Sequence, residues 1–260
     1  MRARNMTGDR LTPQAEPGGH LVGRRPAPPA GPLATAGPAP RLPSRGYAVE
    51  VPAGALRLAG ALEVPVGARA MAVLTTGSGR HRREMSAALR RAGLGTLVLE
   101  LLHPAESAVG HNAFDIVLLA RRLGAACDWL HGETGLPVGC AATGTRAAAA
   151  LEAAAGHDTV RAVVCLSGRP ELARPSSLDR VPVPVLLVTG GRGTRLLGRN
   201  RLAADWLRCP HRVVEIPDAA DPVFSGDAAC RVLALATGWL TGHLGGGTTA
   251  PAPPAPRTWT

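Results

Sequence analysis

The stretch Pro137–Leu151, PVGCAATGTRAAAAL, sets the fold expected for the chain. It begins as an apolar run of strand type, passes through a tight turn rich in glycine and threonine, and continues as an alanine-rich helix. In an α/β sheet, a strand that turns sharply into a helix presents its turn residue at the carboxyl edge, where ligands and nucleophiles usually lie. The sequence therefore predicts a functional edge at this turn, which offers Thr143, Gly144 and Thr145.

Segments of strand and helix type alternate on both sides of this stretch. Strands are predicted at Ala70–Thr75, Thr96–Leu102, Val160–Leu166, Val185–Thr189 and Arg212–Ile216. Helices are predicted from the end of the loop TGSGRHRR (76–83) through Arg91, and at Ala113–His131, Leu196–Leu207 and Asp227–His243, with a variable loop, HPAESAVGHN, before the second of these helices. This alternation implies an α/β class with a mostly parallel, doubly wound sheet and right-handed crossovers. Two leading antiparallel strands, Tyr47–Val51 and Leu56–Val64, narrow the order to that of the α/β-hydrolase fold.

The two ends of the chain differ in composition from its middle. Residues 1–45 are rich in Pro, Gly, Ala and Arg without periodicity, and residues 245–260 are rich in Gly and Pro. Such segments cannot bury enough apolar surface to offset the entropy of ordering them. We therefore expect disordered tails at 1–45 and 245–260 around a single folded domain at 46–244.

The composition argues against several classes of protein. No run approaches the roughly 18 apolar residues of a membrane span, and the first 25 residues lack the apolar core of a secretory leader. The five cysteines show no CxxC spacing, so we expect buried thiols in a reducing cytoplasm, with no metal site, cofactor or disulfide framework.

The net charge of +10 is carried by arginine alone, because the chain contains no lysine. Seven arginines lie in residues 1–45 against only Asp9 and Glu16. Aromatic residues make up 3% of the chain, which leaves few rings for stacking on bases. We therefore expect no specific nucleic-acid binding, and at most weak contact between polyanions and the tail.

Seven stretches carry a family resemblance that extends over nearly all of residues 47–244: LEVPVGARAMAVLTTGSG, RRAGLGTLVLELL, FDIVLLARRLGAACDWL, LPVGCAATGTRAAAALEAAA, VRAVVCLSGRPELA, PVLLVTGGR and GWLTGHL. They resemble the dienelactone-hydrolase-like branch of the α/β-hydrolases, including actinobacterial copies found beside or fused to phosphoribosyltransferase domains. These are framework motifs. The resemblance implies that a Ser-Asp-His triad would lie in three other short loops.

The first of these loops is the nucleophile elbow, which in the family is a small-x-Ser-x-small turn such as GASTG. Aligned without gaps on VG and AAAAL, this chain places Gly144 at the serine position. A shift of one residue places Thr143 there, with a hydroxyl that could attack but a β-methyl that crowds the turn. In a structural interpretation, Thr143 and Thr145 are instead N-cap hydroxyls of the following helix.

The acid and histidine loops also depart from the family pattern. The acid loop, GGRD in relatives, reads GGRGTR and places Gly193 at the acid position. The histidine loop reads IPDAADPVF and places Asp221 or Pro222 at the histidine position. His211 and His243 lie elsewhere, at the start of the last strand and at the end of the last helix, where capping or surface roles are expected.

The oxyanion loop, often HGSG in relatives, reads TGSG across Thr76–Gly79. Thr76 replaces the histidine, while backbone N–H groups at Gly77, Ser78 and Gly79 could still bind an anion or a carbonyl oxygen. Ser78 offers an exposed hydroxyl without a base nearby in sequence.

Three hypotheses remain open from the sequence. The chain is a pseudo-hydrolase that binds a ligand or a protein partner, an active ester or lactone hydrolase that uses Thr143 or Ser78, or a structural scaffold with a filled pocket. A triad acts as a unit, so the departures at Gly144, Gly193 and Asp221 favour the first hypothesis. The sequence identifies neither the ligand nor the partner.

Overall fold

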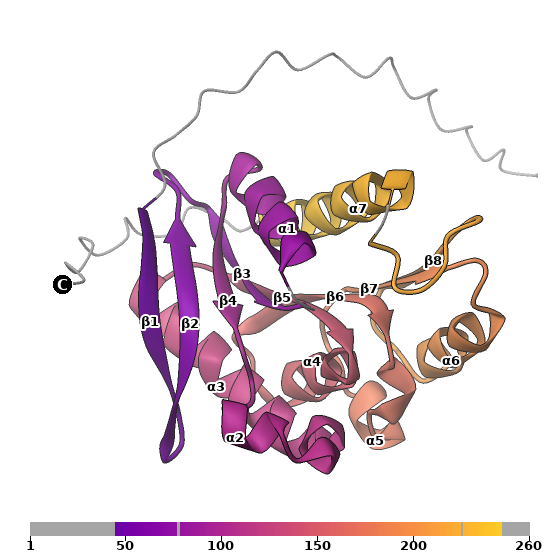
Figure 1. Ribbon diagram of the computed structural model, residues 1–260, viewed down its shortest axis with the longest axis horizontal. Helices are drawn as coiled ribbons and strands as arrows, with labels where there is room; N and C mark the ends of the chain where they lie inside the picture. The colour runs from indigo at the N-terminus through magenta and orange to yellow at the C-terminus, as the bar shows by residue number, and fades with distance from the viewer. Residues whose placement is uncertain (1–44, 77–78, 225, 246–260) are drawn as a thin grey trace, which may run out of the picture. The chain divides into compact units, whose positions relative to one another are not determined.

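A computed structural model describes residues 45–76, 79–224 and 226–245, all within one compact unit, Pro40–Thr260 (Figure 1). The predicted tails at 1–45 and 245–260 lie, apart from Arg45 and Gly245, outside the described residues, as do Gly77 and Ser78. No helix in the described part of the chain is both long enough and apolar enough to cross a bilayer.

The centre of the fold is an eight-stranded mixed sheet with the order β1-β2-β4-β3-β5-β6-β7-β8. Its strands are β1 (Arg45–Ala53), β2 (Leu56–Val64), β3 (Ala70–Thr75), β4 (Leu94–Leu99), β5 (Val138–Gly144), β6 (Val160–Gly168), β7 (Val185–Gly190) and β8 (His211–Ile216). β1 pairs with β2, and β2 with β4, in antiparallel fashion, whereas all other pairs are parallel. The predicted α/β class and sheet type are confirmed.

Helices cover both faces of this sheet (Figure 1). One face carries α1 (Arg80–Arg91) and α7 (Gly226–Leu244), and the other carries α3 (Ile116–Thr134), α4 (Thr145–Gly156), α5 (Pro175–Leu178) and α6 (Thr194–Ala204). Because helices cover both faces, the central strands are mostly apolar, and every residue of β3 and β7 is buried, including Thr75 and Thr189.

The alanines of α4 let this helix pack closely against its neighbours. Ala147, Ala148, Ala149 and Ala150 are all fully buried. An added Cβ at Gly168, at the end of β6, would lie 2.4 Å from the Ala147 Cβ, so neither position accepts a larger side chain without movement. The alanine run thus presses the start of α4 against the carboxyl edge of the sheet.

The segment after β4 is more ordered than the predicted variable loop. It contains α2 (Pro104–Ser107) and a 3-10 turn, Gly110–Phe114, and α3 begins at Ile116 rather than at Ala113. α3 begins there because the Asp115 carboxylate accepts the Leu118 N–H as an N-cap.

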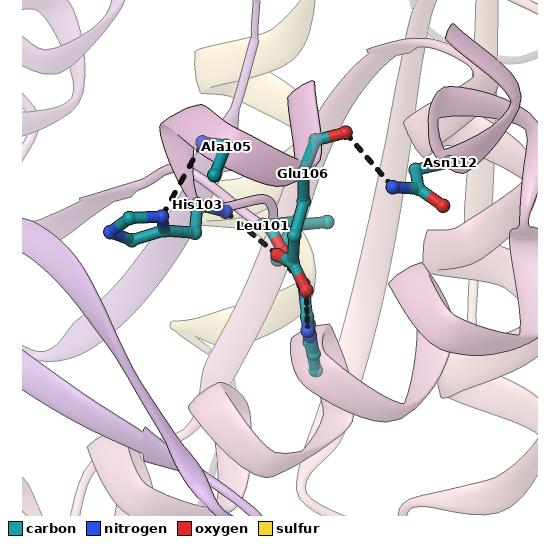
Figure 2. Close-up of polar contacts among 6 residues, drawn as sticks. Leu101, His103, Ala105, Glu106 and Asn112 are labelled. Carbon is teal, nitrogen blue, oxygen red and sulfur yellow. Dashed lines mark hydrogen bonds and ion pairs between the residues drawn. The ribbon is translucent and has the colours of Figure 1, made fainter. Parts of the chain in front are cut away.

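An ion pair fastens α2 to α3 (Figure 2). The two terminal nitrogens of Arg122 donate to the two carboxylate oxygens of Glu106, each over 2.7 Å, and Nη1 also donates to the Leu101 carbonyl over 2.8 Å. The Arg122 guanidinium, together with the His103 backbone N–H, lowers the pKa of Glu106 to about 2. We call this group, Leu101, Glu106 and Arg122, the α2 clasp.

The cysteines follow the prediction with one exception. Cys127, Cys140, Cys165 and Cys209 are buried free thiols, whereas Cys230 on α7 is exposed and the prediction for it was wrong. Burial raises the pKa of the Cys165 thiol. Within the described ranges, no group of three or more His, Cys, Asp or Glu side chains is arranged to hold a metal ion.

Candidate functional site

The turn between β5 and α4 has the backbone of a sharp strand-to-helix elbow with glycine at its apex. Gly144 adopts φ 57° and ψ −135°, a conformation that strains residues with a Cβ, and it is the N-cap of α4. An added Cβ at Gly144 would meet no atom of the described residues within 4 Å. This geometry agrees with the ungapped alignment, in which Gly144 stands at the nucleophile position.

The two threonines beside this glycine have different surroundings. Thr143 is only 8% exposed and pairs with Leu166 within the sheet, while Thr145 opens α4 and is half-buried. The N-cap of α4 is Gly144, so neither Thr143 nor Thr145 occupies the N-cap position expected for it.

The oxyanion loop is described only at its two ends. Thr76 is 6% exposed, and its Oγ1 has no hydrogen-bond partner among the described residues. Gly79 adopts φ 66° and ψ −115° as the N-cap of α1, a backbone conformation close to that of Gly144. The start of each of these two helices therefore relies on a glycine with positive φ.

Asp221, at the predicted histidine position, is the centre of a hydrogen-bonded cluster. Its Oδ1 accepts the Ser167 hydroxyl over 2.6 Å and the Gly190 N–H over 2.9 Å. The Ser167 hydroxyl in turn accepts the Val223 N–H over 3.0 Å. The cluster, Ser167, Gly190, Asp221 and Val223, ties the ends of β6 and β7 to the loop after β8, and we call it the Asp221 cluster.

Gly193, at the predicted acid position, lies directly against this cluster. An added Cβ at Gly193 would lie 2.7 Å from Asp221 Oδ2, closer than side chains approach one another. That oxygen is buried and has no hydrogen-bond partner in the described part of the chain. The absence of a side chain at 193 and the carboxylate at 221 are thus structurally coupled.

The histidines do not supply a base to this cluster. Across 45–76, 79–224 and 226–245, no histidine hydrogen-bonds to Ser167 or Asp221. His211 contacts the Cys209 carbonyl through Nδ1, and His243 lies edge-on to Trp239. His81, at the start of α1, stacks on Phe224 with ring centroids 5.1 Å apart.

Two features of this edge were missed in the sequence. Ser167 has the unusual φ of 43° and follows the predicted strand Val160–Leu166 directly, a position from which its place at the carboxyl edge could have been inferred. Glu100 directly follows β4 and pairs with Arg82 of α1, and its Oε2 lies 3.8 Å from Arg146 Nη2. Arg146 comes two residues after Gly144 and brings positive charge next to the elbow.

Comparisons with known proteins agree with this architecture. No family model matches the chain. A dienelactone hydrolase of known structure from Anabaena variabilis is 37% identical, with a TM-score of 0.72, and the match covers 77% of this chain and 99% of that one. A dienelactone-hydrolase-like promiscuous phosphotriesterase from metagenomic libraries is 18% identical with a TM-score of 0.64, over 77% of this chain and 98% of that one, and shows the same fold.

Two curated relatives from two strains of Mycobacterium tuberculosis carry the name of a phosphoribosyl transferase. Each is 38% identical over 213 residues, which make up 78% of this chain. The chain spans about half the length of these relatives, 48% in each case. Together with the Anabaena enzyme, which is matched over almost its whole length, these findings show that the chain belongs to the dienelactone-hydrolase-like family of α/β-hydrolases.

Proposed function

We propose that this chain is a pseudo-hydrolase, which keeps the family fold but binds a ligand without hydrolysing it. The observation that carries the proposal is the glycine at the elbow apex, because Gly144 has no side chain with which to attack. A triad acts as a unit, so its loss at the nucleophile removes most of the catalytic gain whatever the other residues do.

The Asp221 cluster supports the same proposal. Ser167 touches a carboxylate at this edge, yet its oxygen already donates to Asp221 and accepts the Val223 N–H. The Ser167 hydroxyl uses both its donor and an acceptor site to bridge two loops. Among the described residues it has no imidazole partner that could act as its base. We therefore assign Ser167 a structural role.

An active ester or lactone hydrolase is the alternative. It would need Thr143, which lies inside the sheet and is 8% exposed, or Ser78, which falls outside the described residues. A scaffold with a filled pocket is favoured by one observation. The cavity among Thr76, His81 and Phe224 has a volume of only about 10 Å³, which is barely enough for one water molecule.

The five free cysteines support a reducing, cytoplasmic setting for this role. The longer mycobacterial relatives, by their name, also make a phosphoribosyl transferase a candidate protein partner.

Hydrolysis of p-nitrophenyl acetate and labelling by a fluorophosphonate test the proposal. We expect neither in the wild-type chain, nor in Gly144→Ser, which restores a hydroxyl without a base. The triple variant Gly144→Ser, Gly193→Asp and Asp221→His should gain labelling relative to the same triple with Gly144→Ala. Labelling of the wild-type chain that disappears in Thr143→Ala or Ser78→Ala would overturn the proposal in favour of the active enzyme.

A further inference from the structure

We propose that a groove between α1 and β2 binds a small amphiphilic organic anion, with its head group beside the elbow and its apolar body along β2. The groove has a volume of about 490 Å³, which lies in the range of small-molecule sites. It is lined by small residues of β2, by Val98 of β4, by one face of α1 and by two glutamates at its ends. This inference deepens the binding role proposed above and rests on it.

The floor of the groove is apolar and hollow. Leu58 and Leu62 of β2 point into the core, so the alternate residues Ala59 and Ala61 face outward, where they are exposed. Alanine is depleted in strands, and its short side chain leaves the outer face of β2 recessed. On this face α1 packs mainly on β4, which leaves β2 uncovered beside the helix.

The wall of the groove is the arginine-bearing face of α1. Arg82, Arg83 and Arg90 line it together with Ser86, as expected for residues three, four or seven positions apart on a helix. At a rise of 1.5 Å per residue, Arg82 and Arg90 stand about 12 Å apart along the helix axis. The groove is therefore long enough for an extended acyl or aryl body.

One end of the groove is electrically balanced. Arg90 Nε forms an ion pair with Glu63 Oε2 at 2.8 Å, and the buried Ser86 hydroxyl donates a hydrogen bond to that oxygen over 3.1 Å. These bonds hold the α1 wall against β2. They leave no surplus charge at the Glu63 end, so this end suits the apolar body of a ligand.

The opposite end carries surplus positive charge. Arg82 pairs with Glu100, whose other oxygen lies 3.8 Å from Arg146, so two guanidinium groups share one carboxylate. Arg83 adds a third and has no ion pair among the described residues. This end therefore favours an anionic head group, which would lie next to Arg146 and the vacant nucleophile position at Gly144.

Fluorescence of 8-anilinonaphthalene-1-sulfonate, an apolar aromatic with one sulfonate, provides the binding assay. We expect the full chain to bind one equivalent of this probe. Decanoate, which carries a carboxylate on an apolar chain, should displace it. Inorganic phosphate at the same concentration should not displace the probe, because it lacks an apolar body. Displacement by phosphate as effective as that by decanoate would overturn the proposal.

Three variants place the probe in the groove. Ala61→Trp fills the floor and should weaken binding by about tenfold or more, since the displaced ligand body loses its contacts. Arg83→Gln should weaken it by about threefold to fivefold, as expected for one partly screened charge. Arg91→Gln is the matched control on the same helix, because Arg91 does not line the groove and donates to the Ala87 carbonyl.

Circular dichroism and urea unfolding confirm that each variant is folded. Binding that is unchanged in both Ala61→Trp and Arg83→Gln, or equally reduced in Arg91→Gln, contradicts the proposal. Probe binding and ester hydrolysis are separate measurements. If the chain neither binds the probe nor hydrolyses the ester, the ligand-binding groove is overturned but the proposed loss of catalysis is not. If the chain binds the probe and is labelled by the fluorophosphonate, only the proposed loss of catalysis is overturned.

Discussion

Two carboxylates fasten loops at the carboxyl edge of the sheet, and they do so by different means. Glu106 meets a guanidinium, and both of its oxygens accept from Arg122, whose side chain is 7% exposed (Figure 2). Asp221 meets only neutral donors through one oxygen, while its second oxygen is buried without a partner in the described chain. The α2 clasp fastens two framework elements, whereas the Asp221 cluster contains the residue that the alignment predicts at the histidine position of the family.

This difference indicates which of the two loops tolerates substitution better. Breaking the α2 clasp leaves a buried cation unpaired, so the loop after β4 depends on Glu106. The Asp221 cluster depends on hydroxyl and amide donors and on the missing side chain at Gly193. We therefore expect the loop after β8 to tolerate change better than the loop after β4.

Glu106→Gln should give the largest loss of stability of any single change in these two loops or at the elbow. It removes the charge that balances Arg122, and a buried charge without its partner is strongly unfavourable. The urea midpoint at pH 7 should fall further than for any change at Asp221, Gly193 or Gly144. Glu84→Gln is the matched control, because the Glu84–Arg80 pair is exposed on α1 and contributes little.

The same clasp predicts how stability depends on pH. The pKa of Glu106 is lowered from 4.5 to about 2 in the folded protein, so its contribution is complete above pH 4.5 and is lost as the pH falls towards 2. The stability difference between wild type and Glu106→Gln should therefore shrink over this interval. A difference that stays constant from about pH 5 to about pH 2.5 would contradict the ion pair.

Asp221→Ala should cost about 2 kcal/mol, because it strips acceptors from the Ser167 hydroxyl and the Gly190 N–H, and a buried donor left unpaired costs about 1–3 kcal/mol. Asp221→Asn keeps an acceptor and should cost less. Asp218→Asn, an exposed position in the same loop, should stay near wild type in urea unfolding. An equal loss at both positions would mean that the Asp221 cluster contributes no particular stability.

Gly193→Ala should destabilise by about 1 kcal/mol or more in the wild-type background, because its Cβ would lie 2.7 Å from Asp221 Oδ2 and crowding of this kind costs about 1–3 kcal/mol. Combined with Asp221→Ala, the same change should cost much less, since the clashing oxygen is gone. A double-mutant cycle in urea measures the coupling, and strict additivity would disprove the structural coupling of the two positions.

The sequence predicted the sheet better than the interactions at its edge. β2 and β3 have the predicted bounds because each is an apolar or alternating run between turn residues. The start of α3 was placed three residues early because Phe114 continues the apolar pattern, although the N-cap Asp115 marks the true start. The capping box of α2, from His103 to Glu106, could also have been recognised in the sequence, but this segment was predicted as a loop.

The contacts of the candidate site could not be predicted from the sequence. Ser167 and Asp221 lie 54 residues apart in the chain, and nothing local to either residue indicates that they share a hydrogen bond. The clash between an added Cβ at Gly193 and Asp221 depends on ångström-scale placement of two loops. The alignment could single out Gly193 and Asp221, but only the folded chain shows that a side chain at the first position would clash with the carboxylate of the second.

Gly144→Ala should have the smallest effect of these changes, about 1 kcal/mol of destabilisation, because a residue with a Cβ in a sparsely populated backbone region costs about 1–3 kcal/mol. The added Cβ meets no atom of the described residues within 4 Å, so we expect this cost to come from the backbone. Gly198→Ala in α6, also in open space but in ordinary helical conformation, should instead stabilise the protein slightly. Opposite signs for the two changes in urea unfolding would show that the elbow holds Gly144 in a strained backbone conformation in solution. A stabilising effect of Gly144→Ala would mean that the turn relaxes in solution, and the elbow would then no longer differ from an ordinary helix start.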